Sequence, residues 1–113
     1  MTVSAYDDRQ DHIPSLATPV IETFKFMFPG SETVLEVETA EFTCVCPKTG
    51  LPDYATLKIR YRPNELCLEL KSFKEYLLFF RNLGIFHEHV VNVLARDFAK
   101  ACQPKWLEVR GIF

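Results

Sequence analysis

Two cysteines, Cys44 and Cys46, stand one residue apart and are followed by a turn-forming stretch and an acid, Asp53. Such a pair could hold a metal, form a redox couple or supply a nucleophile. A closed zinc site needs two more ligands, and the other cysteines and the histidines lack the standard ligand spacings. Redox pairs normally separate their cysteines by two residues. A nucleophile, a three-ligand zinc site and an inert structural thiol therefore stay open as interpretations.

Cys46 is predicted to lie in a loop between two strands, and loops on rigid scaffolds often carry reactive groups. The nearby cation Lys48 would favour the thiolate, which is the reactive form of the side chain. Asp53 could donate or accept a proton beside this sulfur. The competing interpretation of Asp53 is an acid that caps a turn.

The segment FHEHV, residues 86–90, is predicted to begin a helix. His87 and Glu88 are adjacent and so about 100° apart around that helix, which means that they cannot share a metal as an HExxH pair does. Both could be ordinary polar residues of a first helical turn. If both point into a cleft, Glu88 can accept paired N–H groups from a purine-like ring while His87 transfers protons.

A third candidate is the segment ELKSFK, residues 69–74. A phosphorylated cofactor there would meet two cations, Lys71 and Lys74, the hydroxyl of Ser72 and a helix N-terminus. The competing interpretation is a solvated helix start. Ser72 and Glu75 form the pattern of a capping box, which predicts that the helix begins at Ser72.

The elements that must position these residues begin after residue 19. Residues 1–19 are polar and aperiodic and are predicted to be a flexible arm, and residues 20–113 to form a single domain. Two strands, or a strand and an irregular lead-in, are predicted within 21–40. The segment 54–62 is the clearest strand, with one apolar face made of Ala55, Leu57, Ile59 and Tyr61. Pro63 and Asn64 then predict an antiparallel hairpin with the segment 65–70.

Two helices and a last strand complete the chain. The first helix has a buried stripe made of Phe73, Tyr76, Leu77 and Phe80, and the second, up to about residue 103, has one made of Phe86, Val90, Leu94 and Phe98. The last strand spans 105–113. Helices that follow strands in this order predict an α+β fold with one covered face of an antiparallel sheet. The sheet of a partner chain would cover the other face, which predicts an oligomer with strands joined edge to edge.

The 113 residues, 48% of them hydrophobic, suit one globular domain, and the net charge of −2 argues against nucleic acid as a partner. No apolar run reaches the roughly 18 residues of a membrane span, and the first residues do not resemble a secretory signal. We therefore expect a cytoplasmic protein whose four cysteines are thiols.

Three stretches closely resemble the NADPH-dependent 7-cyano-7-deazaguanine reductases, the nitrile reductases of queuosine biosynthesis, in their short single-domain form. They are EFTCVCPKTGLPD (41–53), ELKSFK (69–74) and FRNLGIFHEHVVN (80–92). Residues 69–74 match the family signature of Glu, any residue, Lys, Ser or Ala, an apolar residue and Lys. The resemblance implies a tunnelling fold, in which antiparallel sheets of several subunits form a barrel with helices outside and ligand sites between subunits.

The resemblance also implies a role for each candidate. Cys46 would attack the nitrile carbon to form a covalent thioimide, and Asp53 would supply a proton to the nitrogen. Glu88 would bind the pyrimidine edge of the substrate, with His87 assisting binding and proton transfer. Glu69, Lys71, Ser72 and Lys74 would lie at the NADPH site, and no metal would be required. The product would be 7-aminomethyl-7-deazaguanine, the tRNA-modification precursor.

Several alternatives stay open beside this interpretation. Relatives that transfer an amidino group onto the nitrile share the fold but lack the 69–74 signature. A zinc-dependent cyclohydrolase using Cys44 or Cys46, and a purine-binding domain without turnover, are the others. Cys44 stands where many relatives carry a small residue, and it could form a reversible disulfide or simply pack. Relatives usually continue with an Arg-Gly-Gly-Ile stretch, whereas this sequence stops at Phe113, so an edge strand and part of the phosphate-binding surface would be missing.

Overall fold

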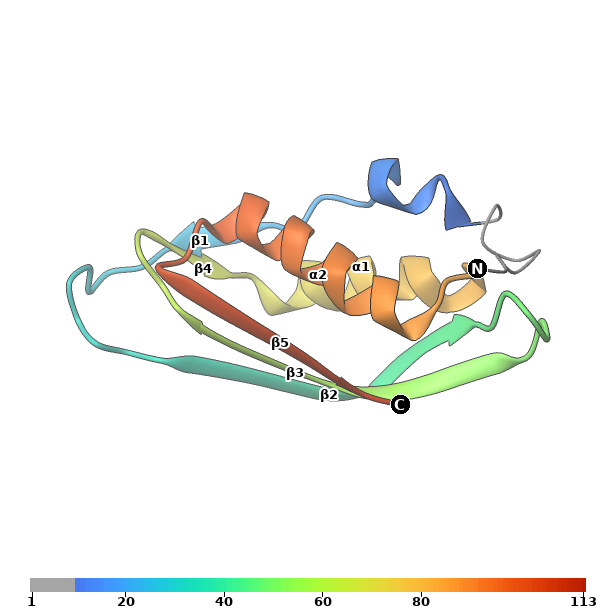
Figure 1. Ribbon diagram of the computed structural model, residues 1–113. Helices are drawn as coiled ribbons and strands as arrows, with labels where there is room; N and C mark the ends of the chain where they lie inside the picture. The colour runs from blue at the N-terminus through green and yellow to red at the C-terminus, as the bar shows by residue number, and fades with distance from the viewer. Residues whose placement is uncertain (1–9) are drawn as a thin grey trace, which may run out of the picture.

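A computed structural model describes residues 10–113 and shows a sheet covered on one face by two helices (Figure 1). The main sheet has three antiparallel strands in the order β2-β3-β5: β2 spans Leu35–Val45, β3 spans Pro52–Arg62 and β5 spans Trp106–Ile112. The predicted α+β class and the antiparallel sheet are confirmed. Both outer strands, β2 and β5, leave one edge free of strand partners among the described residues.

The alternation of β3 determines which face of the sheet is buried. Its predicted apolar residues, Ala55, Leu57, Ile59 and Tyr61, are all 5% exposed or less. The opposite face is charged: Lys58 pairs with Glu38 at 3.7 Å and Arg60 with Glu108 at 4.0 Å. A face of this kind can contact water, so its burial by a partner sheet is not required for stability.

The helices cover the apolar face as their periodicity predicts (Figure 1). Helix α1 spans Leu70–Leu78 and continues as a 3-10 helix, Phe79–Asn82, and α2 spans His87–Cys102. The predicted stripes are buried except at Leu77 and Phe86, which are half-buried. Helix α2 ends where Gln103 adopts a left-handed conformation with φ of 46°.

Helix α1 begins earlier than the capping-box pattern predicts, because Glu69 rather than Ser72 is its N-cap. The Glu69 carboxylate accepts hydrogen bonds from the backbone N–H groups of Lys71 (2.9 Å) and Ser72 (2.7 Å). The Ser72 hydroxyl instead accepts from the Glu22 N–H (2.8 Å) and donates to the Glu69 carbonyl (3.0 Å). The acidic cap accepts hydrogen bonds from the first helical N–H groups, and its negative charge also interacts favourably with the positive end of the helix dipole.

The predicted hairpin between β3 and the next segment is wrong. Strand β4, Leu66–Leu68, pairs with β1, Thr23–Lys25, in a separate two-stranded antiparallel sheet. The reason is that β2 and β5 already occupy both edges of β3, so no ladder position is left for β4. Strand β4 is instead tied to β3 by a side chain, because the Leu68 N–H donates to the Tyr61 hydroxyl at 3.0 Å.

The segment before β1 lies against α2 (Figure 1). Residues 1–9 of the predicted arm lie outside the described residues, but a 3-10 helix, Ile13–Ser15, packs with Ile13 buried in the core. Thr18 donates to the Asp97 carboxylate at 2.7 Å, and Arg96 donates to the carbonyls of Pro14 and Leu16. The later half of the predicted arm is therefore attached to the domain, and the boundary at residue 19 stays a prediction.

Candidate active site

The end of the β2 strand meets the start of α2, which brings the predicted nucleophile close to the predicted proton-transfer residues. The Val45 N–H donates to the Leu83 carbonyl at 2.9 Å, and the Ile85 N–H donates to the Val45 carbonyl at 3.1 Å. These two hydrogen bonds hold the loop before α2 beside the residue that precedes Cys46. Because this backbone pairing is parallel, the chain leaves it in the same direction on both sides, toward Cys46 on one and toward His87 on the other.

Asp53 and His87 form a direct contact, with 3.0 Å between the Asp53 Oδ2 and the His87 Nε2. Asp53 lies opposite Cys44 in the β2–β3 register, and opposed residues place their side chains on the same face of a sheet. Because Cys44 is buried beneath the helices, Asp53 also points to that face and reaches the start of α2. The pair can share and relay a proton.

His87 has a second neighbour that sequence reasoning did not single out. The ring of Phe113 stacks on the imidazole with 3.9 Å between centroids and 10° between planes. Phe113 also contacts Phe42 of the core, with an edge-to-face geometry. The imidazole is therefore held in orientation by a hydrogen bond to Asp53 and by an aromatic ring.

Cys46 lies in the turn that leads from β2 to β3. The Gly50 N–H donates to the Cys46 carbonyl at 2.8 Å and closes this turn, and Gly50 has φ of 71°, a conformation that glycine adopts without strain. Hydrogen bonds from the Thr49 side chain and from the backbone N–H groups of Thr49 and Lys48 lower the pKa of the Cys46 thiol. The prediction that Lys48 favours the thiolate needs a correction, because its backbone amide rather than its charge has this effect.

The other three cysteines are buried, and all four are free thiols. Burial, followed by the charges of Asp53 and Cys46, raises the pKa of Cys44 to about 11. Burial also raises the pKa of Cys67, and that of Cys102 to about 11. Of the two earlier interpretations of Cys44, packing fits its complete burial in the core. Cys46 is therefore the one thiol suited to act as a nucleophile.

We expect Thr49→Val to shift the alkylation of Cys46 to higher pH. Loss of the hydroxyl removes the largest contribution that lowers the pKa of this thiol, so less thiolate is present at any given pH below the new pKa. The rate of iodoacetamide labelling as a function of pH, followed by intact mass, measures the change. Thr49→Ser keeps a hydroxyl and is the matched control. An unchanged pH profile in Thr49→Val would show that this hydrogen bond does not tune the sulfur.

Glu88 follows His87 in the first turn of α2 and is exposed. Its backbone carbonyl accepts a hydrogen bond from the Asn92 side chain at 2.7 Å, while its carboxylate is available to a ligand at the surface next to His87. The position agrees with the predicted contact to a purine-like edge, which stays a prediction. An exposed carboxylate needs a second wall to exclude water before it can bind selectively.

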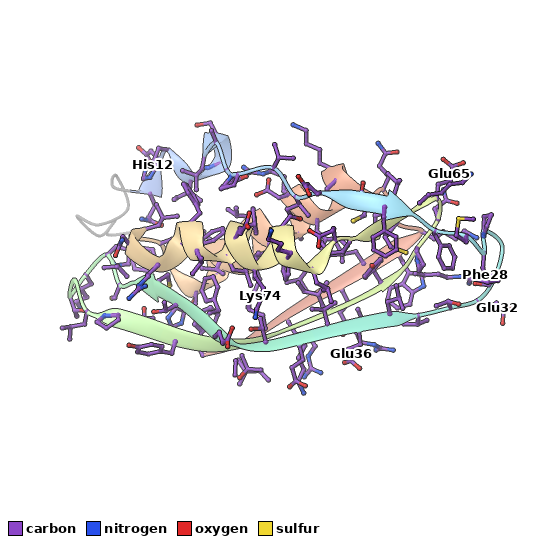
Figure 2. All side chains as sticks on the ribbon, turned by 180° about the vertical axis from the view of Figure 1, so that it is seen from behind. His12, Phe28, Glu32, Glu36, Glu65 and Lys74 are labelled. Atoms are coloured by element: carbon purple, nitrogen blue, oxygen red, sulfur yellow. The ribbon has the colours of Figure 1, made fainter. Side chains whose placement is uncertain are left out.

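The 69–74 segment borders a groove of about 790 Å³ between α1 and β2. Lys74 lies between these two elements (Figure 2) and pairs with Glu41 of β2 at 3.9 Å. Of the four residues predicted for the cofactor, Lys74 lines this groove, whereas Glu69 and Ser72 shape the start of α1. Hydrogen bonds from the Ser72 and Lys71 backbone amides lower the pKa of the Glu69 carboxyl.

The groove combines features that suit a phosphorylated dinucleotide. Lys74 and Arg81 supply two cations, which face two acids of β2, Glu38 and Glu41. Helix α1 contributes the apolar side chains of Leu70, Phe73, Leu77 and Leu78. Cations recognise phosphates, and apolar walls accommodate the faces of aromatic bases. Arg81 was not among the predicted residues. Cys46 and Asp53 do not line this groove.

Residues 10–113 contain no group of three His, Cys, Asp or Glu side chains arranged to hold a metal ion. No helix in this part of the chain is long and apolar enough to cross a membrane.

Comparisons with known proteins identify the family to which the chain belongs. The family model described as QueF-like protein matches residues 52–113, which is more than half of the chain. The chain is 49% identical over 90 residues to the NADPH-dependent 7-cyano-7-deazaguanine reductase of Chloroherpeton thalassium, covering 80% of this chain and 78% of that protein. The protein of the same name from Anaeromyxobacter sp. is 48% identical over 101 residues, covering 89% and 83%.

A solved structure gives independent support for the fold. The crystal structure of the archaeosine synthase QueF-Like in the apo form matches with a TM-score of 0.67 and 23% identity, over 72% of this chain and 80% of that one. At this level of identity the match concerns the fold alone. The sequence relatives carry the assignment, and the chain belongs to the QueF-like family of the NADPH-dependent 7-cyano-7-deazaguanine reductases.

Proposed function

We propose that this protein reduces the nitrile of 7-cyano-7-deazaguanine to the aminomethyl group with NADPH, through a thioimide on Cys46. The observation that carries this proposal is the position of one thiol with a lowered pKa close to the hydrogen-bonded Asp53–His87 pair. A nitrile accepts hydride poorly, whereas a protonated thioimide accepts it readily, so a nucleophile and a separate acid are needed. The relatives' shared name supports this substrate and cofactor.

The first step uses the Cys46 thiolate. Its sulfur forms a bond to the nitrile carbon, and the electrons of one carbon–nitrogen π bond move to the nitrogen. That nitrogen takes a proton from Asp53, which leaves a neutral thioimide attached to the protein. The contact of Asp53 with His87 gives the carboxylate a route to regain its proton.

The remaining steps need two hydrides, which carry four electrons, one more proton on the nitrogen and the release of Cys46. NADPH, when bound, would supply one hydride to carbon at the thioimide stage and, from a second molecule, another at the imine stage, while the Asp53–His87 pair can pass the second proton to the nitrogen. Between these additions the carbon–sulfur bond breaks, and Cys46 leaves as the thiolate. The hydrogen bonds from Thr49 and Lys48 that lower the pKa of Cys46 also make it a better leaving group.

Lys74 and Arg81 would hold the phosphates of NADPH in the groove between α1 and β2. Lys74 is exposed, and its pairing with Glu41 at 3.9 Å is weak, so a phosphate can compete for the ammonium. Lys71, also exposed on α1, remains a proposed contact. Glu69 and Ser72 serve this site by fixing where α1 begins.

We expect Glu88→Ala to weaken nitrile binding about 10- to 100-fold while changing NADPH binding less than about 2-fold, because a charged hydrogen-bond acceptor is lost only from the substrate site. Calorimetric titrations in a Cys46→Ala background measure both affinities without covalent chemistry. Glu75→Ala, which removes an exposed acid from α1, is the control. Equal losses for both ligands would contradict the assigned role of Glu88.

A second copy of the chain is proposed to complete the site. In the single chain Cys46 is only half-buried and Glu88 is exposed, and the apolar side chains of Leu51 and Tyr54 beside the turn are 64% and 67% exposed. The free edges of β2 and β5 can pair between copies to close a barrel. Light scattering on the purified protein tests this assembly, and a monomer that reduces the nitrile would contradict it.

Oxidation of NADPH on addition of authentic 7-cyano-7-deazaguanine tests the proposed reaction. The expected result is loss of NADPH absorbance at two equivalents per nitrile, with the aminomethyl product found by mass. An amidino transfer would consume the nitrile without NADPH. Reaction without loss of NADPH would therefore contradict the reductase assignment.

A further inference from the structure

We propose that Gln10, in the segment that precedes the sheet, is a positioning residue that holds the start of α2, and with it His87 and Glu88, in the geometry needed for catalysis. This inference rests on the proposed function of those two residues. Gln10 is 6% exposed, although it belongs to a segment that the sequence predicts to be a loose arm. A buried amide far from the site in sequence calls for a structural partner.

The Gln10 side chain bonds to the backbone on both sides of Ile85, which lies two residues before the start of α2. Its amide nitrogen donates to the Gly84 carbonyl at 3.2 Å, and its carbonyl oxygen accepts from the Phe86 N–H at 3.3 Å. Val45 pairs with the opposite edge of the same loop through the Leu83 carbonyl and the Ile85 N–H. The side-chain amide of Gln10 therefore acts as a neighbouring strand would, and the loop is held from two sides.

The same oxygen also contacts the helix itself. The His89 Nδ1 lies 3.1 Å from the Gln10 Oε1, and an amide oxygen can only accept, so this nitrogen carries the proton. Phe86 is the N-cap of α2 and provides no side-chain cap. Gln10 thus accepts from the backbone N–H of the N-cap residue, which is the contact that a side chain at the third helical position makes in a capping box.

These contacts enclose the residues that act on the substrate. His87 and Glu88 stand between Phe86 and His89, the two residues whose nitrogen atoms bond to Gln10. On the other edge of the loop, Val45 is followed directly by Cys46. A change at Gln10 would let the start of α2 move relative to the sulfur, and displacements on the order of 1 Å can reduce rates about 100-fold.

The test compares Gln10→Leu with Thr18→Val. Both remove side-chain hydrogen bonds of the same segment, but Thr18 is anchored to Asp97 near the middle of α2, away from the catalytic residues. We expect Gln10→Leu to slow formation of the nitrile adduct on Cys46 about 10- to 100-fold, with iodoacetamide labelling of Cys46 unchanged. Thr18→Val should stay within about 2-fold of the wild type. Equal adduct rates in the two variants would overturn the inference.

Two additional measurements keep the inference testable. If Gln10→Leu does not fold, Gln10→Met keeps the length of the side chain and removes both its donor and its acceptor, and a wild-type adduct rate in that variant would overturn the proposal. If the wild type forms no adduct, the proposed function fails. Hydrogen exchange then decides the role of Gln10 alone. Faster exchange at residues 85–89 in Gln10→Leu but not in Thr18→Val supports it, and equal exchange contradicts it.

Discussion

Cys46→Ala is expected to lower nitrile reduction about 10⁴-fold or more, because the variant has no atom that can form the thioimide. The rate of NADPH oxidation with the nitrile present measures the loss. The fold should be unaffected, since Cys46 lies in a turn outside the buried core. The nitrile should still bind non-covalently through Glu88.

Cys44→Ala is the matched control for this variant. Cys44 lies two residues away, and burial, followed by the charges of Asp53 and Cys46, raises its pKa to about 11, so it contributes little thiolate at neutral pH. We expect Cys44→Ala to retain activity at a cost in thermal stability. Loss of turnover in Cys44→Ala with full turnover in Cys46→Ala would reverse the assignment.

Asp53→Asn is expected to lower kcat about 10²- to 10⁴-fold, which is the range for loss of a general acid. Asparagine can keep a hydrogen bond to His87 but cannot release a proton to the nitrile nitrogen. Besides the hydrogen bonds from Thr49 and Lys48 that lower the pKa of Cys46, the charge of Asp53 raises it. The variant should therefore form the Cys46 thiolate at slightly lower pH while its turnover falls.

Two measurements on the same protein separate these effects. Iodoacetamide labelling of Cys46 should be as fast as in the wild type or faster, and NADPH oxidation should be much slower. Glu36→Gln, which neutralises an exposed acid of β2, is the control and should change neither rate. Parallel losses of labelling and turnover would indicate that Asp53 supports the nucleophile rather than the proton transfer.

The sequence predicts the covered sheet well, because burial there follows simple periodicity. Ala55, Leu57, Ile59 and Tyr61 alternate on β3, and all four are buried. Leu94 and Phe98, four residues apart on α2, are buried as well. Each of these patterns depends only on residues that are close in sequence, and the sheet has a single apolar face that must be buried.

Pairing between strands was less predictable. Pro63 and Asn64 form a plausible hairpin turn, but a turn does not reveal that both edges of β3 are taken by strands distant in sequence. The capping-box pattern at Ser72 failed because a stronger acceptor, Glu69, precedes it by three residues. A local capping pattern does not show which of two nearby residues will accept from the first N–H groups of a helix.

At the candidate active site, the sequence shows the residue types but not their contacts. The turn after Cys46 and the acid at Asp53 are visible in the sequence, and the resemblance to a family supplied their roles. The hydrogen bond between Asp53 and His87 joins residues 34 apart, and the contacts of Gln10 join residues 74 to 79 apart. No periodicity signals such contacts, because they arise only when the sheet and α2 have been assembled.

The thioimide on Cys46 is tested most directly by incubating the protein with 7-cyano-7-deazaguanine in the absence of NADPH. Intact mass should increase by the mass of one nitrile per chain, and peptide mapping should place the increase on Cys46. Addition of NADPH should then remove the adduct and release the amine. An adduct on Cys44, Cys67 or Cys102, or turnover of the nitrile with no adduct at any stage, would contradict the account.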